Sequence, residues 1–274
     1  MGETRTMLAR ALLLSLLAAS ACGPAASTGD DDGADAPPGA PDAPDARPFA
    51  DAPPAPIVMY AHSRDTLYAI DDTSFALTTI GSFGTSDLIT DLAVTSDGTL
   101  YGISKTELYR IDGATGLAAR IASVPGLENV GLTFLPDDTL LATDKAGGVR
   151  RVNPATGQVT EIGAFGGGYA TAGDLVAVAD GTMYAISDEG PVGDEFDDNL
   201  LLTVNTANGS AAPVGQIGFG QVFGVAYANG HVYAFNNAGK IIEIDRATGA
   251  GTERASHPVE FWGAGVSPLV PLIP

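Results

Sequence analysis

The chain has 274 residues, of which 45% are hydrophobic and 17% charged, and its 33 acidic and 13 basic side chains give a formal net charge of -20. A nucleic-acid-binding protein needs a basic face and a disulfide scaffold needs at least two cysteines, so an acidic chain with one cysteine excludes both classes. A low charge density against a background of Gly, Ala, Thr and Val is typical of a β-rich protein.

Residues 1–21 have the pattern of a secretory signal. Arg5 and Arg10 provide positive charge before the apolar run Ala11–Ala21. A helix that spans a bilayer needs about 20 apolar residues, so this run is too short to be one. It predicts a cleaved signal peptide, which is excluded from the reasoning about the fold.

The sole cysteine, Cys22, follows this signal directly. It is preceded by the small residues Ala19, Ser20 and Ala21 and followed by Gly23. The segment resembles the lipobox of bacterial lipoproteins, although Ala19 stands where leucine is most often found. The resemblance implies that the Cys22 thiol is diacylated and the new amino terminus acylated, and two or three acyl chains anchor a protein stably. The alternative is an ordinary signal peptide with an incidental cysteine.

Residues 22–56 are predicted to be a disordered tether rich in Asp, Ala, Pro and Gly. Beyond Cys22 the segment carries seven acids and one arginine, buries almost nothing and repels itself. The acidic run Asp30–Asp32 is interpreted as part of a solvated linker rather than as a calcium site. With a lipidated Cys22, the tether would hold the folded part outside the cytoplasm, in the bacterial cell envelope and most simply at the outer membrane.

Residues 57–274 contain a fivefold repeat of short strand-like segments. One set of segments carries Tyr or Leu at its second position, and these positions are spaced 41, 40, 43 and 49 residues apart. Its members are Met59–Ser63, Leu100–Ser104, Leu140–Asp144, Met183–Ser187 and Val232–Asn236. A second set ends in Asp or Asn: Leu67–Asp71, Leu108–Asp112, Val149–Asn153, Leu201–Asn205 and Ile241–Asp245. The constant order of the two sets predicts hairpins.

Turn-forming residues stand between these segments. Asp97-Gly98, Asp180-Gly181 and Asn229-Gly230 have the backbone freedom of tight hairpins, and Asp137-Asp138 is a poorer version. Ala-Thr-Gly or Ala-Asn-Gly turns follow four of the five second segments, and the closing Asp or Asn is expected to hydrogen-bond the turn backbone. These recurring acids are therefore interpreted as structural.

A third set of segments precedes the Asx-Gly pairs or ends the chain: Asp91–Val94, Gly131–Phe134, Leu175–Val178, Gly224–Tyr227 and Gly263–Val266. A fourth strand is expected around the position nine residues after the Asp or Asn that ends each segment of the second set. Four-stranded units of this length predict an all-β fold, a five-bladed β-propeller. Because the chain begins at a second strand and ends with a spare first strand, the C-terminal strand is expected to join the N-terminal blade and close the ring.

The repeat motif, LYxID with ATG after a DGxLY turn, resembles the broad class of bacterial repeat propellers that includes NHL-like, quinoprotein-like and streptogramin-lyase-like proteins. The resemblance covers residues 57–274, and its motifs are those of the blade. It implies the fold, and a fold does not imply a function.

The residues just before the third set are expected to converge at the mouth of the central channel. They form an oxygen-rich set without Lys or Arg: Asp91, Glu128, Asn129, Asp174, Gln221 and Glu260. Such a ring could bind calcium, which takes six to eight oxygen ligands; the alternative is a set of solvated rim residues. Beside it, Phe261 and Trp262 are candidates for stacking on a sugar, or else core aromatics.

Two functions fit the sequence. The first is a non-catalytic, membrane-tethered monomer that binds a protein or glycan through one face. The second is a hydrolase or lyase with a carboxylate or calcium site at the channel, in which Asp91, Asp174 and Glu260 would act. Nearly uniform blades favour binding. The one insertion, Ser187–Asn199, is acidic and is interpreted as a solvated excursion rather than as a second cation loop.

Overall fold

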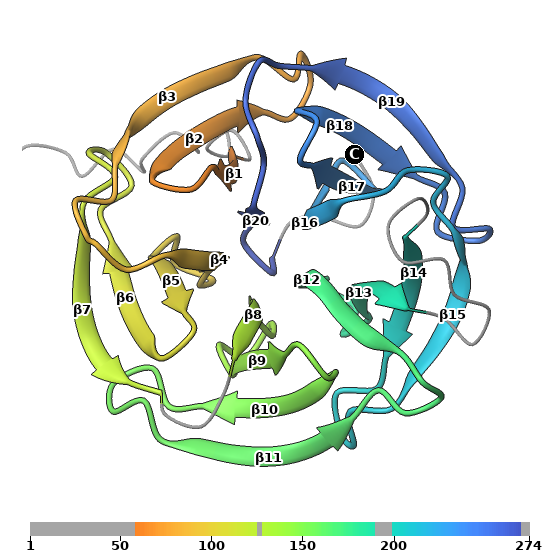
Figure 1. Ribbon diagram of the computed structural model, residues 1–274, viewed down its shortest axis with the longest axis horizontal. Coiled ribbons are helices and arrows are strands. Elements are labelled where there is room, and N and C mark those ends of the chain that lie inside the picture. The colour runs from red at the N-terminus through yellow and green to blue at the C-terminus, as the bar shows by residue number, and fades with distance from the viewer. Residues whose placement is uncertain (1–57, 125–127, 190–198, 270–274) are drawn as a thin grey trace, which may run out of the picture. The chain divides into compact units, whose positions relative to one another are not determined.

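A computed structural model describes residues 58–124, 128–189 and 199–269. These residues form five antiparallel sheets of four strands each, arranged as blades around a central axis (Figure 1). The predicted five-bladed β-propeller is thereby confirmed. The signal segment, Cys22 and the tether lie outside the described residues, as does most of the fourth-blade insertion. Within the described part of the chain, no helix is long and apolar enough to cross a membrane.

Each blade runs from an inner strand at the axis to an outer strand at the rim. Blade 1 contains β20 (Gly263–Gly265), β1 (Val58–His62), β2 (Thr66–Asp71) and β3 (Leu77–Ser82). Blade 2 contains β4 (Ile89–Val94), β5 (Leu100–Ser104), β6 (Glu107–Ile111) and β7 (Ala118–Ser123). Blade 3 contains β8 (Asn129–Phe134), β9 (Leu140–Asp144), β10 (Gly148–Val152) and β11 (Val159–Ala164). Blade 4 contains β12 (Ala170–Ala177), β13 (Met183–Glu189), β14 (Leu200–Val204) and β15 (Ala211–Gln216). Blade 5 contains β16 (Val222–Ala228), β17 (His231–Asn236), β18 (Lys240–Ile244) and β19 (Gly251–Ser256).

The ring is closed by the C-terminal strand, as the sequence predicts. β20 pairs with β1, with Gly263 opposite His62 and Gly265 opposite Tyr60. The first blade is therefore built from both ends of the folded chain, and the spare first strand completes it.

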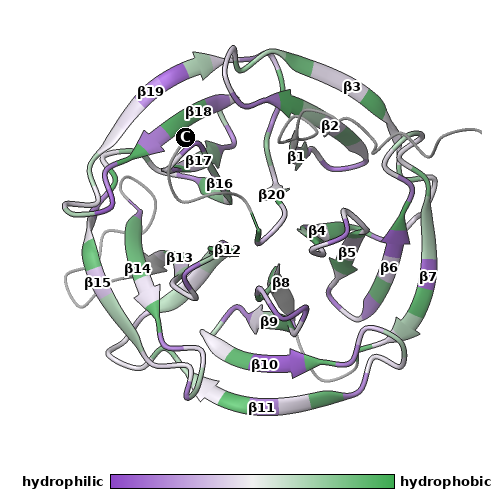
Figure 2. Ribbon diagram, turned by 180° about the vertical axis from the view of Figure 1, so that it is seen from behind, coloured by the Kyte–Doolittle hydropathy of each residue, from purple (hydrophilic) through white to green (hydrophobic). Residues whose placement is uncertain are grey.

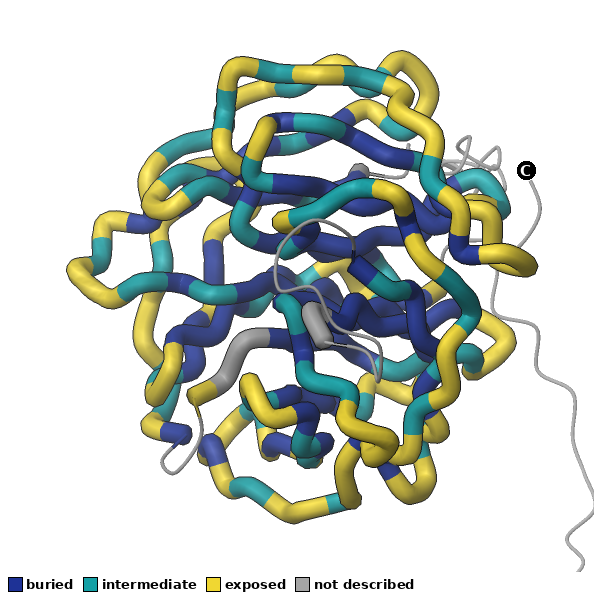
Figure 3. The backbone as a smooth tube through the Cα atoms, turned by 45° about the vertical axis from the view of Figure 1, so that its right-hand side comes forward, coloured by how far each residue is buried: buried dark blue, intermediate teal, exposed yellow. Residues whose placement is uncertain are grey.

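Burial follows the distance from the axis. The second strands, such as β5 and β9, are almost entirely buried, and the third strands, such as β2 and β6, combine buried with partly exposed side chains. The outer strands are the most exposed (Figure 3). Figure 2 shows hydrophilic residues interspersed along outer strands such as β19 and β7. The core consists of apolar clusters between neighbouring blades, and the largest includes Phe235 and Phe261.

The turn between the third and outer strands is organised by its closing Asp or Asn. The Asp112 carboxylate accepts the backbone N–H of Ala114 at 2.8 Å and that of Thr115 at 3.0 Å. These bonds lower the pKa of Asp112, and the turn at Asp245 repeats the arrangement. The structural interpretation of these acids is confirmed.

Neighbouring blades dock through these same turns. In β3, β7, β11 and β15 the fifth residue of the outer strand forms a notch that receives the turn of the next blade. A Cβ on Gly163 of β11 would overlap the carbonyl oxygen of Asn208, and one on Gly215 of β15 would overlap that of Thr248. In blade 2 the notch residue is Ala122, whose Cβ lies against Gly157.

The seam between blades 5 and 1 departs from this pattern. Phe75 occupies the turn position that glycine fills in the other blades, and its φ is 57°. Its ring packs edge to face on Tyr233 with centroids 5.3 Å apart, and its carbonyl oxygen lies 2.9 Å from His257 Nε2. Aromatic packing offsets the strain of a left-handed conformation at the one seam that joins the ends of the chain.

The Asp137-Asp138 turn has Asp138 at the position that glycine fills in other blades, and the backbone of Asp138 is left-handed with a φ of 58°. Its carboxylate accepts the N–H of Ser96 at 2.8 Å and the Ser96 hydroxyl at 2.6 Å. Here a glycine is replaced by a side chain that ties blade 3 to blade 2.

Replacing Gly163 with Ala tests the notch. We expect the added methyl group to push the Asn208 turn outward and to cost about 1–3 kcal/mol, which lowers Tm by roughly 2–12 °C for a domain of this size. The measurement is a thermal melt. The reciprocal control is Ala122→Gly at the equivalent position of blade 2, expected to cost about 1 kcal/mol or less. Equal stability of Gly163→Ala and wild type would refute the docking role.

Candidate functional site

The inner strands β4, β8, β12, β16 and β20 surround the axis (Figure 1) and bring one residue from each blade to equivalent positions. These axial residues are Asp91, Gly131, Asp174, Gly224 and Gly263. Both aspartates are fully buried. Two carboxyl groups and three glycines therefore form one layer across the channel.

Backbone amides from all five blades donate to these two carboxyl groups. Asp91 accepts the N–H of Leu92 at 2.8 Å and, from blade 3, that of Leu132 at 2.6 Å. Asp174 accepts its own blade's Leu175 N–H at 2.6 Å. It also accepts Val225 N–H of blade 5 at 2.6 Å and Ala264 N–H of blade 1 at 3.3 Å. We call this arrangement the axial layer.

The two carboxyl groups of the axial layer also hydrogen-bond each other. Such a bond needs a proton between the two carboxyl groups. Burial favours keeping that proton because it disfavours the charged form of a carboxyl group. Burial raises the pKa of Asp174 to about 8, and burial together with the neighbouring Asp174 charge raises the pKa of Asp91 well above its ordinary value. The pair therefore holds at least one proton at neutral pH.

The three glycines are required by close packing in the same layer. A Cβ on Gly131 would lie 2.6 Å from the Gly173 oxygen, and one on Gly224 would lie 2.9 Å from the Gly263 carbonyl carbon. A Cβ on Gly263 would lie 2.7 Å from Asp91 Oδ1. The axis has room for two side chains and no more.

His62 is a third buried titratable group beside the axial layer. It lies opposite Gly263 in the β1–β20 pair, and its Nδ1 is 2.7 Å from the Ser63 carbonyl oxygen. Its Nε2 atom is buried without a hydrogen-bond partner among the described residues. Burial lowers the pKa of His62 to about 4, so the ring is neutral at neutral pH.

Of the six residues expected to form a ring of oxygen ligands, the structure brings together Asp91 and Asp174. Glu128 is exposed and lies 3.7 Å from Lys105, and Gln221 and Glu260 are exposed. The side chain of Asn129 lies outside the described residues. Among the residues described, no group of three or more His, Cys, Asp or Glu side chains has a geometry that could hold a metal ion.

Both buried aspartates are also closed to a substrate. Their side chains have no solvent exposure, and the oxygens already accept backbone amides. A catalytic acid or base must reach the reacting group. The hydrolase or lyase alternative thus gains no support from this pair, and the calcium site stays a hypothesis.

Above the axial layer lies a hollow of about 300 Å³ at the channel mouth. Its lining is mostly apolar and comes from four blades: Leu88, Thr90, Ala172, Gly173, Phe223, Asn237 and Trp262. Leu88, Phe223 and Trp262 are half-buried. We call this feature the mouth pocket.

The two aromatic candidates from the sequence have different places. Trp262 lines the mouth pocket, and its backbone N–H donates to the His62 carbonyl oxygen at 2.8 Å. Phe261 is fully buried in the core and packs edge to face on Phe235 with centroids 5.5 Å apart. A ligand in the mouth pocket would therefore meet Trp262, whereas Phe261 supports it from below.

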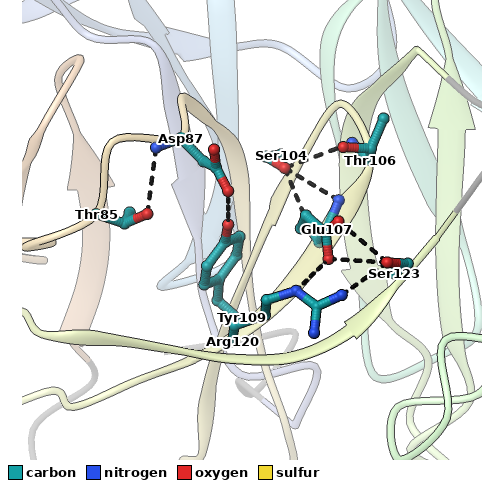
Figure 4. A network of polar contacts seen from close by, with 8 residues as sticks. All are labelled: Thr85, Asp87, Ser104, Thr106, Glu107, Tyr109, Arg120 and Ser123. Carbon is teal, nitrogen blue, oxygen red and sulfur yellow. Dashed lines mark hydrogen bonds and ion pairs between the residues drawn. The ribbon is translucent and has the colours of Figure 1, made fainter.

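Hydrogen bonds fix the loops that carry the other walls. The Tyr109 hydroxyl donates to Asp87, the residue before Leu88, and burial raises the pKa of Tyr109 to about 12 (Figure 4). Nearby, Arg120 binds Glu107 at 2.6 Å and ties β7 to β6. On the opposite wall, the Asn237 N–H donates to the Gln221 oxygen at 2.9 Å, which joins the segments that carry Asn237 and Phe223.

Sequence reasoning missed Leu88, Phe223 and Asn237. A signal for part of the pocket was available: Thr90, Gly173, Phe223 and Trp262 each immediately precede an axial residue. Leu88 and Asn237 come from loops whose position no repeat pattern indicates.

No family model and no curated protein matches the sequence. The fold matches a chain in the crystal structure of a nidogen/laminin complex, with a TM-score of 0.54, 13% identity and coverage of 77% of this chain and 97% of that chain. It also matches a structural genomics protein of unknown function from Bacteroides thetaiotaomicron, with a TM-score of 0.52, 16% identity and coverage of 74% and 58%, respectively. At these identities the likeness shows the fold alone: the protein is of the β-propeller class.

The axial layer predicts a dependence of stability on pH. Because its folded pKa values are raised, its contribution is complete below 3.8 and is lost as pH rises through about 8. His62 acts oppositely, since its lowered pKa contributes stability above 6.5 that is lost as pH falls toward 4. His62 stops titrating near pH 6.5 in the unfolded chain, so between about pH 6.5 and 8 the free energy of unfolding should fall as pH rises, by about 1 kcal/mol per pH unit for each proton that the pair retains.

Urea denaturation at half-unit steps of pH measures this slope. The exposed substitution Asp65→Asn is the matched control and should keep it. The double variant Asp91→Asn, Asp174→Asn has no titrating pair and should show a flatter profile, on a lower overall stability. An unchanged slope in the double variant would exclude the axial pair as its source.

Proposed function

We propose that this protein is a lipid-anchored binding module of the bacterial cell envelope and that its ligand binds in the mouth pocket. The observation that carries the proposal is the mouth pocket itself. Three half-buried large apolar side chains from three blades, Leu88, Phe223 and Trp262, surround one hollow. Such concave, mostly apolar sites with a few polar groups are the usual form of ligand sites.

Other hollows of the described surface are larger but more polar: two of them, of about 450 and 460 Å³, are lined in part by charged side chains. The large hydrophobic side chains that are more than half exposed are Leu117, 58% exposed, and Leu269, 51% exposed. Leu117 lies beside Gly84 of the segment that joins β3 to β4, whereas Leu269 follows β20 at the end of that strand away from Trp262. Scattered single residues need no explanation, whereas apolar side chains gathered in a hollow do.

The floor of the mouth pocket is rigid, which favours binding. Thr90, Gly173 and Trp262 precede the axial residues Asp91, Asp174 and Gly263, whose layer is held by amides from every blade. A preformed wall loses little conformational freedom when a ligand enters.

Lipidation is tested by expression of the full chain in a Gram-negative host with an alkyne-tagged fatty acid. We expect Cys22 to be labelled and the protein to sediment with membranes. The variant Cys22→Ser should lose the label because it lacks the thiol, whereas Ser20→Ala should keep it. Equal labelling of wild type and Cys22→Ser would contradict the anchor without bearing on the mouth pocket.

Binding is tested by saturation-transfer NMR with fragments that cover neutral rings, aromatic acids, aromatic amines and monosaccharides. We expect a subset to bind wild type and to bind Leu88→Ala at least threefold more weakly, because that change removes one wall. Leu269→Ala, the matched change beyond the end of β20 away from Trp262, should bind like wild type. If no fragment distinguishes the two variants, the mouth pocket is not the ligand site.

A further inference from the structure

The lining of the mouth pocket contains no charged residue. The titratable groups beneath its floor, His62, Asp91 and Asp174, are fully buried and expose no atom to it. An ion that entered would lose water without meeting a counter-ion, which is costly. An anion would in addition be repelled by a chain with a formal net charge of -20. The lining therefore selects against ionised ligands.

The size of the mouth pocket suits one ring. Its volume is about 300 Å³, whereas an apolar cavity of roughly 150 Å³ already admits benzene. The half-buried faces of Phe223 and Trp262 offer aromatic contact to such a ring. A single ring with one or two substituents fits, and a chain of several rings would extend beyond the pocket.

A polar side chain of the lining can contact a ligand. The amide side chain of Asn237 is half-buried and can give or accept a hydrogen bond. The indole Nε1 of Trp262 has no acceptor among the described residues, but this atom is buried and does not open into the pocket. A ligand with an acceptor beside the Asn237 amide would form a bond that an apolar ring cannot form.

We propose that the mouth pocket binds an uncharged ring that carries a hydrogen-bond acceptor, with Leu88, Phe223 and Trp262 around the ring and the Asn237 amide N–H directed to the acceptor. This inference rests on the proposed binding function and names the chemistry of its ligand. Neutral hydroxylated or carbonyl-substituted aromatic compounds are the class described.

Four phenyl compounds of nearly equal size test the class: benzyl alcohol, toluene, benzoate and benzylammonium. Trp262 is the sole tryptophan of the chain, so its fluorescence reports the pocket directly. For a ligand of eight heavy atoms we expect a Kd of about 1 mM for benzyl alcohol. Toluene, which lacks the acceptor, should bind several-fold more weakly, and the two ions at least tenfold more weakly.

Variants separate the roles of the walls. Leu88→Ala should weaken benzyl alcohol and toluene alike, and Leu269→Ala should weaken neither. Asn237→Leu keeps the size of the side chain and removes the amide, so it should reduce benzyl alcohol binding to the level of toluene. All three variants retain Trp262, so its fluorescence still reports binding.

The two possible failures look different. Tighter binding of benzoate or benzylammonium than of benzyl alcohol, still dependent on Leu88, would overturn the ligand class and leave the binding function standing. The same holds if toluene equals benzyl alcohol in wild type, since the donor would then have no role. Absence of Leu88-dependent binding for every compound, including the wider fragment set, would overturn the function itself.

Discussion

The propeller depends on the hydrogen bonds between five backbone amides and two aspartate side chains at its axis. Inner strands of a ring leave N–H groups directed at the axis, where water has no room, and a buried unpaired amide is costly. Asp91 and Asp174 satisfy the amides of all five blades, three of them from blades other than their own. The ring is thus held at its centre by side-chain bonds as well as at its closing seam by β20.

The two acids of this layer hold at least one proton between them at neutral pH. A fully ionised pair, buried and in contact, would repel itself, whereas each charge that is retained strengthens the bonds from the amide donors. The same argument explains the glycines: Gly131, Gly224 and Gly263 admit the carboxyl groups of other blades because they have no Cβ.

A closed axis decides where a ligand can bind. The channel of this propeller is blocked one residue below the mouth pocket, so binding is confined to the surface above the block. Asp91 and Asp174, which the sequence indicated as candidate metal ligands, are the residues that close the channel. Buried acids at a channel are therefore no sign of a metal until their hydrogen bonds have been assigned.

The fold could be predicted from the sequence because each blade repeats its turns at fixed offsets, and the acids Asp112 and Asp245 do in the structure what turn chemistry requires. The axial pairing could not. Asp91 and Asp174 stand in only two of five units, and their partners lie in other blades 41 to 90 residues away along the chain. Phe75 was equally hidden, since it fills a position for which the repeat predicts glycine.

The mouth pocket exists because the axial residues and the residues one position before them are under different packing constraints. At the axial position two units carry Asp and three carry Gly, because the packing admits only two side chains. One residue earlier, where the chain meets solvent, the constraint ends and the described units carry residues as different as Thr90, Gly173, Phe223 and Trp262. A nearly symmetric scaffold thereby supports an asymmetric surface. Specific recognition of a small ligand needs that asymmetry, because five equal walls would present the same chemistry in five directions.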